Sequence, residues 1–176
     1  MLLLNKFSTI ARVMILLSLM LSMTACGFRL RGNVEVPEVL QQTHISGVAE
    51  FSQLNQELKR VLQRSGSEVL SRPENAKSII SISGESFRRR VLSVDAQGRT
   101  SEYELRYRYD FNIRGADGEE IVRKQTIDLT RDYQFDPNNI LAKDAEEVQI
   151  RSDMIKFSVR QMMRRVDSQL KSSRSK

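Results

Sequence analysis

The sequence predicts an α+β fold, a two-layer sandwich of two helices packed on a mostly antiparallel or mixed sheet of four to five strands. Two observations lead to this prediction. Three consecutive segments in the middle of the chain have strand-like alternation of apolar and polar residues, and short glycine-containing connections join them. Two other segments, at 51–66 and from 137 onward, have apolar residues at three- and four-residue spacing, which is typical of helices with one buried face.

The first 25 residues have the order of a secretory signal. Lys6 and Arg12 precede an apolar core at 13–23, which two small residues follow. The core has 11 residues, whereas a transmembrane helix needs about 20. We therefore expect export and no permanent membrane span.

Cys26 is the only cysteine, so a disulfide within the chain is excluded. The segment MTAC resembles the lipobox of bacterial lipoproteins, although Met23 stands where that family usually has leucine. The resemblance implies cleavage before Cys26, which then carries an S-diacylglycerol and an N-acyl group; no other cofactor is expected. In such lipoproteins an aspartate after the cysteine retains the protein in the inner membrane. Glycine at position 27 therefore implies sorting to the outer membrane. An ordinary exported protein with an incidental cysteine is the alternative.

The expected organisation is a lipoprotein signal peptide at 1–25, a lipidated tether at 26–41, one domain at 42–171 and a disordered tail at 172–176. Beyond residue 25 there are 26 basic and 22 acidic residues, a net charge of +4. An exported protein does not normally meet nucleic acid, so the available polyanions are lipid phosphates and lipopolysaccharide. A solvated surface of mixed sign is the alternative interpretation.

The domain begins with a short strand at 43–47, whose direction relative to its neighbour the sequence leaves open. A helix at 51–66 follows, a short strand at 67–71, and a turn at 72–75. The apolar stripe of the helix at 51–66 consists of Phe51, Leu54, Leu58, Val61 and Leu62.

Strands at 78–94, 102–114 and 119–133 come next and form an antiparallel meander, with connections at 95–98 and 115–118. The alternation is unbroken from Tyr103 to Arg114, which indicates one buried and one solvated face. The last helix starts at Pro137, with Asp136 as its N-cap. Its apolar stripe is expected to comprise Leu141, Ala145, Val148, Ile155, Val159, Met162, Val166 and Leu170.

No motif predicts an enzyme. His44 is the only histidine, and a catalytic role would need a nucleophile and an orienting partner that no motif supplies. A zinc site lacks ligands for the same reason, and glycine-rich phosphate loops are absent from the sequence.

Basic residues recur on the three long strands. They are Arg88, Arg89 and Arg90 on the first, Arg99, Arg106 and Arg108 at the second, and Arg123 and Lys124 on the third. Arginine binds phosphate oxygens with two parallel hydrogen bonds, so a shared face would suit an anionic ligand. Cross-strand pairing with Glu102, Glu104, Asp110 and Asp128 is the alternative, and the charge pattern alone favours it.

Three segments carry a specific resemblance: CGFRLRG at the lipobox, GRTSEYEL in the second long strand, and RDYQFDPNNILAKDAEE before and within the last helix. Together they resemble the LptE family, the outer-membrane lipoproteins of lipopolysaccharide assembly. The resemblance implies a non-enzymatic protein that helps the LptD β-barrel to fold, occupies its lumen and binds lipopolysaccharide. An envelope-scaffolding or barrel-assembly lipoprotein that makes only protein contacts is the alternative.

The resemblance also implies where lipopolysaccharide binds. Lys143, in the LAK motif, is one candidate contact; pairing with the glutamates of the next turn is its alternative role. The family's second basic position lies in the hairpin loop before Tyr103, where this chain has Ala96 with Arg99 nearby. Arg99 is the candidate substitute at that position, and Arg106 and Arg108, from the basic residues on the strands, complete the set of candidates.

Overall fold

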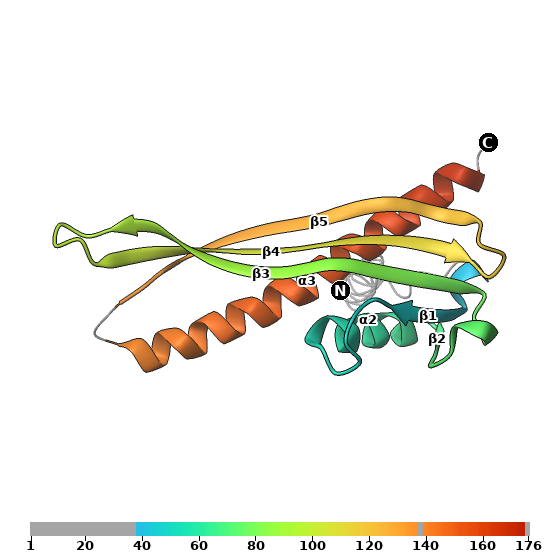
Figure 1. Cartoon of the computed structure of the whole chain (residues 1–176), viewed down its shortest axis with the longest axis horizontal. Coiled ribbons are helices and arrows are strands. Elements are labelled where there is room, and N and C mark those ends of the chain that lie inside the picture. Colours follow the sequence, from blue (N-terminus) through green and yellow to red (C-terminus); the bar gives the residue numbers. More distant parts are fainter. Residues whose placement is uncertain (1–37, 137–138, 175–176) are drawn as a thin grey trace, which may run out of the picture. The chain divides into compact units, whose positions relative to one another are not determined.

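The fold is a five-stranded mixed sheet covered on one face by two helices (Figure 1). The computed structural model describes residues 38–136 and 139–174. The strands are β1 (Gln42–Ser46), β2 (Glu68–Leu70), β3 (Ser78–Val94), β4 (Thr100–Gly115) and β5 (Glu120–Gln134), and the helices are α2 (Gln53–Arg64) and α3 (Ile140–Arg174). Two short 3₁₀ turns, η1 (Glu38–Leu40) and η2 (Pro73–Asn75), complete the described elements. The predicted α+β class and the number of strands are confirmed.

The strand order is β2-β1-β3-β4-β5, with β1 parallel to both β2 and β3. This order settles the direction that the sequence left open. Helix α2 is the crossover between the parallel strands β1 and β2, as parallel neighbours require. Strands β3, β4 and β5 pair antiparallel, as predicted.

The turn after β1 depends on a glycine. Gly47 has a φ of +80°, and a Cβ at this position would collide with the backbone oxygen of Ile82 in β3. Only glycine combines this backbone conformation with so close an approach to a neighbouring strand.

Helix α2 buries the predicted apolar stripe. The Ser52 hydroxyl caps its N-terminus by accepting the backbone N–H of Asn55 at 3.1 Å. Leu54, Leu58 and Leu62 are fully buried. The prediction was wrong for Phe51, which lies before the cap and is 86% exposed. Because it precedes the first helical turn, it does not share the buried face of the helix.

The core lies between the helices and one face of the sheet, in a single cluster. Alternate residues of β4 supply its centre: Leu105, Tyr107, Tyr109, Phe111 and Ile113 are buried, as the alternation predicted. From α3 the cluster takes Met154, Ile155, Val159, Met162 and Val166.

The beginning of α3 differs from the prediction. The helix begins at Ile140 rather than at Pro137, which is outside the described residues. The Lys143 N–H donates to the Asn139 carbonyl at 3.1 Å, so Asn139, and not Asp136, is the N-cap residue. Ala145 and Val148, expected on the buried stripe, are both exposed, and no side chain from Ala142 to Asp153 is buried.

Two observations concern the expected ends of the domain. Leu40, in the segment expected to be the tether, is fully buried in the core. Helix α3 continues to Arg174, into the segment expected to be disordered. The Ser173 hydroxyl there donates to the Gln169 carbonyl at 3.0 Å.

Candidate functional site

Residues from two of the sequence motifs meet where the β3–β4 hairpin, the end of β5 and the start of α3 come together (Figure 1). The segment EYEL contributes Glu102 and Tyr103. The segment running into the last helix contributes the end of β5 and the first two turns of α3. The sequence placed these residues in separate elements, and the structure brings them to one region.

An aromatic cluster forms one side of this region. The rings of Tyr103 and Tyr133 stack with centroids 5.7 Å apart, and Phe135 meets Tyr103 edge-on at 5.2 Å. The Arg89 guanidinium lies over the Tyr103 ring, 4.6 Å from its centroid. These contacts join β3, β4 and the chain after β5.

Glu147 links this cluster to α3. Its Oε2 accepts hydrogen bonds from Arg89 Nη1 and from the Tyr133 hydroxyl, each at 2.7 Å. Burial and the bond to this carboxylate raise the pKa of Tyr133 to about 12. The same carboxylate raises the pKa of Arg89. One turn further along, Arg151 lies over the Phe87 ring at 4.6 Å. These contacts, together with Ile150, which packs partly against the core, hold the segment Ala142–Asp153 of α3, in which no side chain is fully buried.

A groove of about 450 Å³ lies beside the cluster. Its lining residues are Ser93, Ser101, Glu102, Gln134, Phe135, Asp136 and Lys143. The hydroxyls of Ser93 and Ser101 are 2.7 Å apart, and Ser93 Oγ is 2.9 Å from Glu102 Oε2. The groove therefore offers hydroxyls, one ammonium group and two carboxylates.

Lys143 is the cation of this groove. Its side chain is 21% exposed, and its Nζ lies 2.7 Å from Glu146 Oε2. The pairing considered from sequence is therefore present. An anion in the groove must compete with Glu146 for the ammonium group, and it meets the carboxylates of Glu102 and Asp136 nearby.

Arg99 closes the β3–β4 loop and is not among the residues that line the groove. Its Nε donates to Asp95 Oδ2 at 2.8 Å, and its backbone N–H donates to Asp95 Oδ1 at 2.9 Å. These bonds lower the pKa of Asp95. Ala96 lies exposed in the same loop. Arg99 thus has a structural role in the hairpin.

Arg106 and Arg108 lie on the solvated face of the sheet, away from the groove lining. Arg106 Nε donates to Asp128 Oδ1 at 2.8 Å, and Arg108 Nη1 lies 3.9 Å from Asp128 Oδ2. The pairs Arg90–Glu104 at 2.7 Å and Lys124–Asp110 at 3.1 Å lie on the same face. Cross-strand pairing, the alternative favoured by the charge pattern, is confirmed for these cations.

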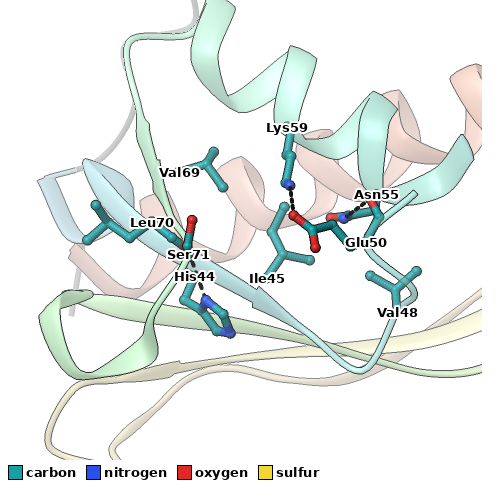
Figure 2. Close-up of a pocket in the computed structure, with 9 residues that line it drawn as sticks. All are labelled: His44, Ile45, Val48, Glu50, Asn55, Lys59, Val69, Leu70 and Ser71. Carbon is teal, nitrogen blue, oxygen red and sulfur yellow. Dashed lines mark hydrogen bonds and ion pairs between the residues drawn. The ribbon is translucent and has the colours of Figure 1, made fainter. Parts of the chain in front are cut away.

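A smaller pocket of about 220 Å³ lies at the carboxyl ends of β1 and β2, beside the start of α2 (Figure 2). His44 Nδ1 is 3.0 Å from the Leu70 carbonyl oxygen. Figure 2 shows Lys59 reaching towards Glu50, with Nζ 3.9 Å from Oε1. Within 38–136 and 139–174, no group of three or more metal-ligating side chains has the arrangement of a metal site.

Comparison with known proteins identifies the family. The family model described as "LptE: Lipopolysaccharide-assembly" matches residues 40–166. The chain belongs to the LptE family. Membership in this family implies a role in lipopolysaccharide assembly.

Relatives of the LptE family cover most of the chain. The LPS-assembly lipoprotein LptE of Photorhabdus laumondii is 26% identical over 153 residues, which are 86% of this chain and 83% of that protein. The protein of the same name from Yersinia enterocolitica is 27% identical over 158 residues, covering 88% and 74%. The solution structure of an uncharacterized lipoprotein B from Nitrosomonas europaea has a TM-score of 0.66 and 33% identity, and covers 81% of this chain and 91% of its own. A minor lipoprotein from Acinetobacter baumannii shares the fold, with a TM-score of 0.62 at 22% identity, covering 75% and 94%.

The lipid attachment predicted at Cys26 stays a prediction, because Cys26 and its lipobox lie outside the described residues. None of the described helices is both long and apolar enough to cross a membrane.

The contacts of Arg89, Tyr133 and Glu147 were missed from sequence. The alternation of side chains along β5 could have indicated them. Tyr133 is six residues after the buried Ile127, an even number, so both side chains lie on the helix-facing side of the sheet. Arg89 is opposite Leu105 in β4 and shares that side.

Proposed function

We propose that the chain is an outer-membrane lipoprotein, anchored through acyl groups on Cys26, that assembles with an LptD-type β-barrel and occupies its lumen. It binds lipopolysaccharide there and assists its insertion into the outer leaflet. Membership in the LptE family carries this proposal. The role requires binding and positioning, and no bond is made or broken by the protein.

The lumen-filling role is supported by the solvated face of the sheet. Strands β3, β4 and β5 present alternating cations and anions there, paired across the strands. The lumens of large outer-membrane barrels are polar. A rigid sheet with a polar, charge-paired face suits that environment better than an apolar face.

The Lys143 groove supports lipopolysaccharide binding. Lys143 lies in the first two turns of α3, where backbone N–H groups without helical partners also favour an anion. A lipopolysaccharide phosphate that displaces Glu146 would take over the ammonium group. Because Glu146 is the competitor, the two residues should affect binding in opposite directions.

This opposition gives the test of the groove. Lys143→Ala should weaken binding of lipopolysaccharide by the purified full chain about fivefold, the size expected of one partly screened charge contact. Glu146→Gln should strengthen it by removing the competitor. Lys171→Ala is the matched control, because Lys171 forms a 2.7 Å pair with Asp167 near the other end of α3.

The expected effects should shrink as salt concentration rises. Equal affinity for the Lys143→Ala variant, the Lys171→Ala variant and the unaltered protein would remove Lys143 from the site. The same assay on Arg99→Ala tests the loop cation, whose contribution to binding should be smaller because Asp95 holds it.

The barrel partner is tested by recovering tagged protein from solubilised outer membranes. A large β-barrel protein should be co-purified and should be identified as LptD by mass spectrometry. Recovery of a barrel without any lipopolysaccharide binding would favour the scaffolding alternative, in which the protein makes only protein contacts.

The anchor is tested separately. Cys26→Ala should abolish incorporation of labelled fatty acid into the protein. Continued incorporation would show that the lipid is attached elsewhere.

A further inference from the structure

The distal end of the β3–β4 hairpin carries an unusual number of exposed apolar side chains. Val91, Leu92 and Val94 are 52%, 43% and 58% exposed, and we refer to these three residues as the apolar tip. They make up half of the large apolar side chains that are exposed in the described part of the chain. The others, Phe51, Val148 and Phe157, lie on separate segments. Exposed apolar residues that gather at one place mark interaction sites, whereas single ones do not.

The sheet leaves only part of the apolar tip uncovered: Val91 is opposite Tyr103, which is still paired with β5, whereas Val94 is opposite Thr100, beyond the end of β5. The last pair between β4 and β5 is Glu102 with Gln134, and the Phe135 N–H then donates to the Ser101 carbonyl at 2.8 Å. The hairpin continues past this point, and Figure 1 shows it projecting beyond the end of β5. Leu92 has no cross-strand partner, because the register shifts between Val91 and Ser93.

The projecting hairpin is well ordered by its own hydrogen bonds. The Asp95 backbone N–H donates to the Arg99 carbonyl at 2.8 Å, and the Gly98 N–H donates to the Asp95 carbonyl at 2.9 Å. The Asp95 carboxylate accepts the N–H of Gln97 at 3.0 Å, besides the two bonds from Arg99. The apolar tip is thus displayed on a closed loop rather than on a loose one.

The neighbourhood of the apolar tip combines apolar surface with cations. Ser93, between Leu92 and Val94 in the chain, lines the groove that contains Lys143. Arg88 lies on β3 just before the tip, whereas the neighbouring Arg90 and Arg99 are already paired with Glu104 and Asp95. A ligand that has both anionic groups and hydrocarbon chains matches this combination.

The chemistry of the tip favours hydrocarbon over a protein partner. Residues that dominate protein–protein binding are mainly Trp, Tyr and Arg, and Leu and Val are under-represented among them. Stable protein interfaces bury about 1,200–2,000 Å² in total, and three aliphatic side chains supply a small part of that area. Acyl chains require only apolar area and no matching hydrogen bonds.

We propose that the apolar tip is the surface of this protein that binds acyl chains of lipopolysaccharide, while the adjacent groove with Lys143 binds its phosphates. This inference rests on the proposed function, because it assigns the parts of one ligand to two neighbouring surfaces. It predicts that the two surfaces can be inactivated independently.

The test uses the fact that the chain contains no tryptophan. The Leu92→Trp variant of the full chain is titrated with lipopolysaccharide, and its fluorescence emission should shift to the blue as the indole enters hydrocarbon. Phe51→Trp is the control, since Phe51 is the most exposed of the large apolar side chains and lies before α2. Its emission should not shift.

Binding measurements complete the test. The double variant Leu92→Ser, Val94→Ser should bind lipopolysaccharide about tenfold or more weakly, because it removes two aliphatic side chains. It should bind fully deacylated lipopolysaccharide, which has lost its ester- and amide-linked acyl chains but retains its phosphates, as well as the unaltered protein does. Lys143→Ala should weaken the binding of both ligands.

The outcomes separate the two proposals. If the unaltered chain binds no lipopolysaccharide, both this inference and the binding part of the proposed function fail. If it binds, but the Leu92→Trp emission is unchanged and the double variant binds normally, only this inference is refuted. An emission shift with phosphatidylglycerol vesicles and none with lipopolysaccharide also refutes it, in favour of a bilayer surface. Should the double variant fail to fold, the emission of the Leu92→Trp variant decides.

Discussion

Replacing Glu147 with glutamine should release the start of α3 while the rest of the fold stays intact. The Glu147 carboxylate accepts bonds from Arg89 and Tyr133, and no side chain between Ala142 and Asp153 is buried. Segments with few buried apolar contacts open locally at low free energy. The carboxylate is therefore a main determinant of the stability of this segment.

The size of the effect follows from the two bonds. A hydrogen bond to a charged group contributes about 1.5–3 kcal/mol. The side chains of Glu147 and Arg89 are 22% and 45% exposed, so solvent reduces the ion pair to about 1 kcal/mol or less. Glutamine keeps one acceptor for the Tyr133 hydroxyl and loses the charge. We expect the free energy of local opening to fall by about 1–2 kcal/mol, which is roughly a 5- to 30-fold increase in the open population.

Amide hydrogen exchange, resolved by residue, measures this change. Exchange of the α3 amides before Met154 should accelerate by roughly that factor in the Glu147→Gln variant. Amides from Met154 to Val166, where the helix is buried in the core, should change little. Glu146→Gln is the matched control, because it breaks only the helix-surface pair with Lys143, worth about 0.3–0.5 kcal/mol.

Two results would refute this reasoning. One is equal exchange rates at the start of α3 in the Glu147→Gln variant and the unaltered protein. The other is uniform acceleration along the whole of α3, which would show that the substitution weakens the global fold rather than a local segment.

Three further predictions concern the rest of the domain. Gly47→Ala should lower the free energy of unfolding by about 2 kcal/mol or more, measured by urea denaturation, because the added Cβ collides with the Ile82 carbonyl at a positive φ; a loss below about 0.5 kcal/mol would contradict the geometry. The pKa of Tyr133 is raised to about 12 in the folded protein, so its contribution to stability is present below about pH 10 and is lost as the pH rises towards 12. The free energy of unfolding, measured with urea, should therefore fall less steeply with alkaline pH in the Tyr133→Phe variant. An equally steep fall in both proteins would contradict this prediction. Arg106→Ala should leave the urea-measured stability almost unchanged, because its pair with Asp128 is exposed to solvent. A clear loss of stability would show that this pair contributes to holding the sheet together.

Much of the fold could be predicted from the sequence because β4 is so regular. Its unbroken alternation determines which side chains enter the core, and Leu105 to Ile113 are buried as expected. The short connections on either side then leave an antiparallel meander as the natural arrangement. The place of β1 could not be found in this way, since strands as short as β1 and β2 carry little pattern, and their neighbours are chosen by tertiary packing.

The candidate site was predictable in part. Lys143 was found through its motif, and its pairing with Glu146 followed from helical spacing. The helical period failed for Val148, because a helix buries its apolar stripe only where a partner surface lies beneath it. From Ala142 onward, burial in α3 begins at Met154, so the stripe positions Ala145 and Val148 are exposed. The apolar tip carried no periodic signal, and part of its exposure arises from the point at which β5 ends.

The parallel pairing of β1 with β3 determines how far the site lies from the entry of the chain into the domain. Thr43 is opposite Ser78, at the start of β3, whereas the apolar tip lies at the other end of that strand. β3 has 17 residues and therefore extends about 50 Å at roughly 3.3 Å per residue. The hydrocarbon core of a bilayer is only about 30 Å thick. In the proposed lipoprotein, whose tether would enter the domain next to β1, the apolar tip therefore lies farther from that entry than the hydrocarbon core of a bilayer is thick.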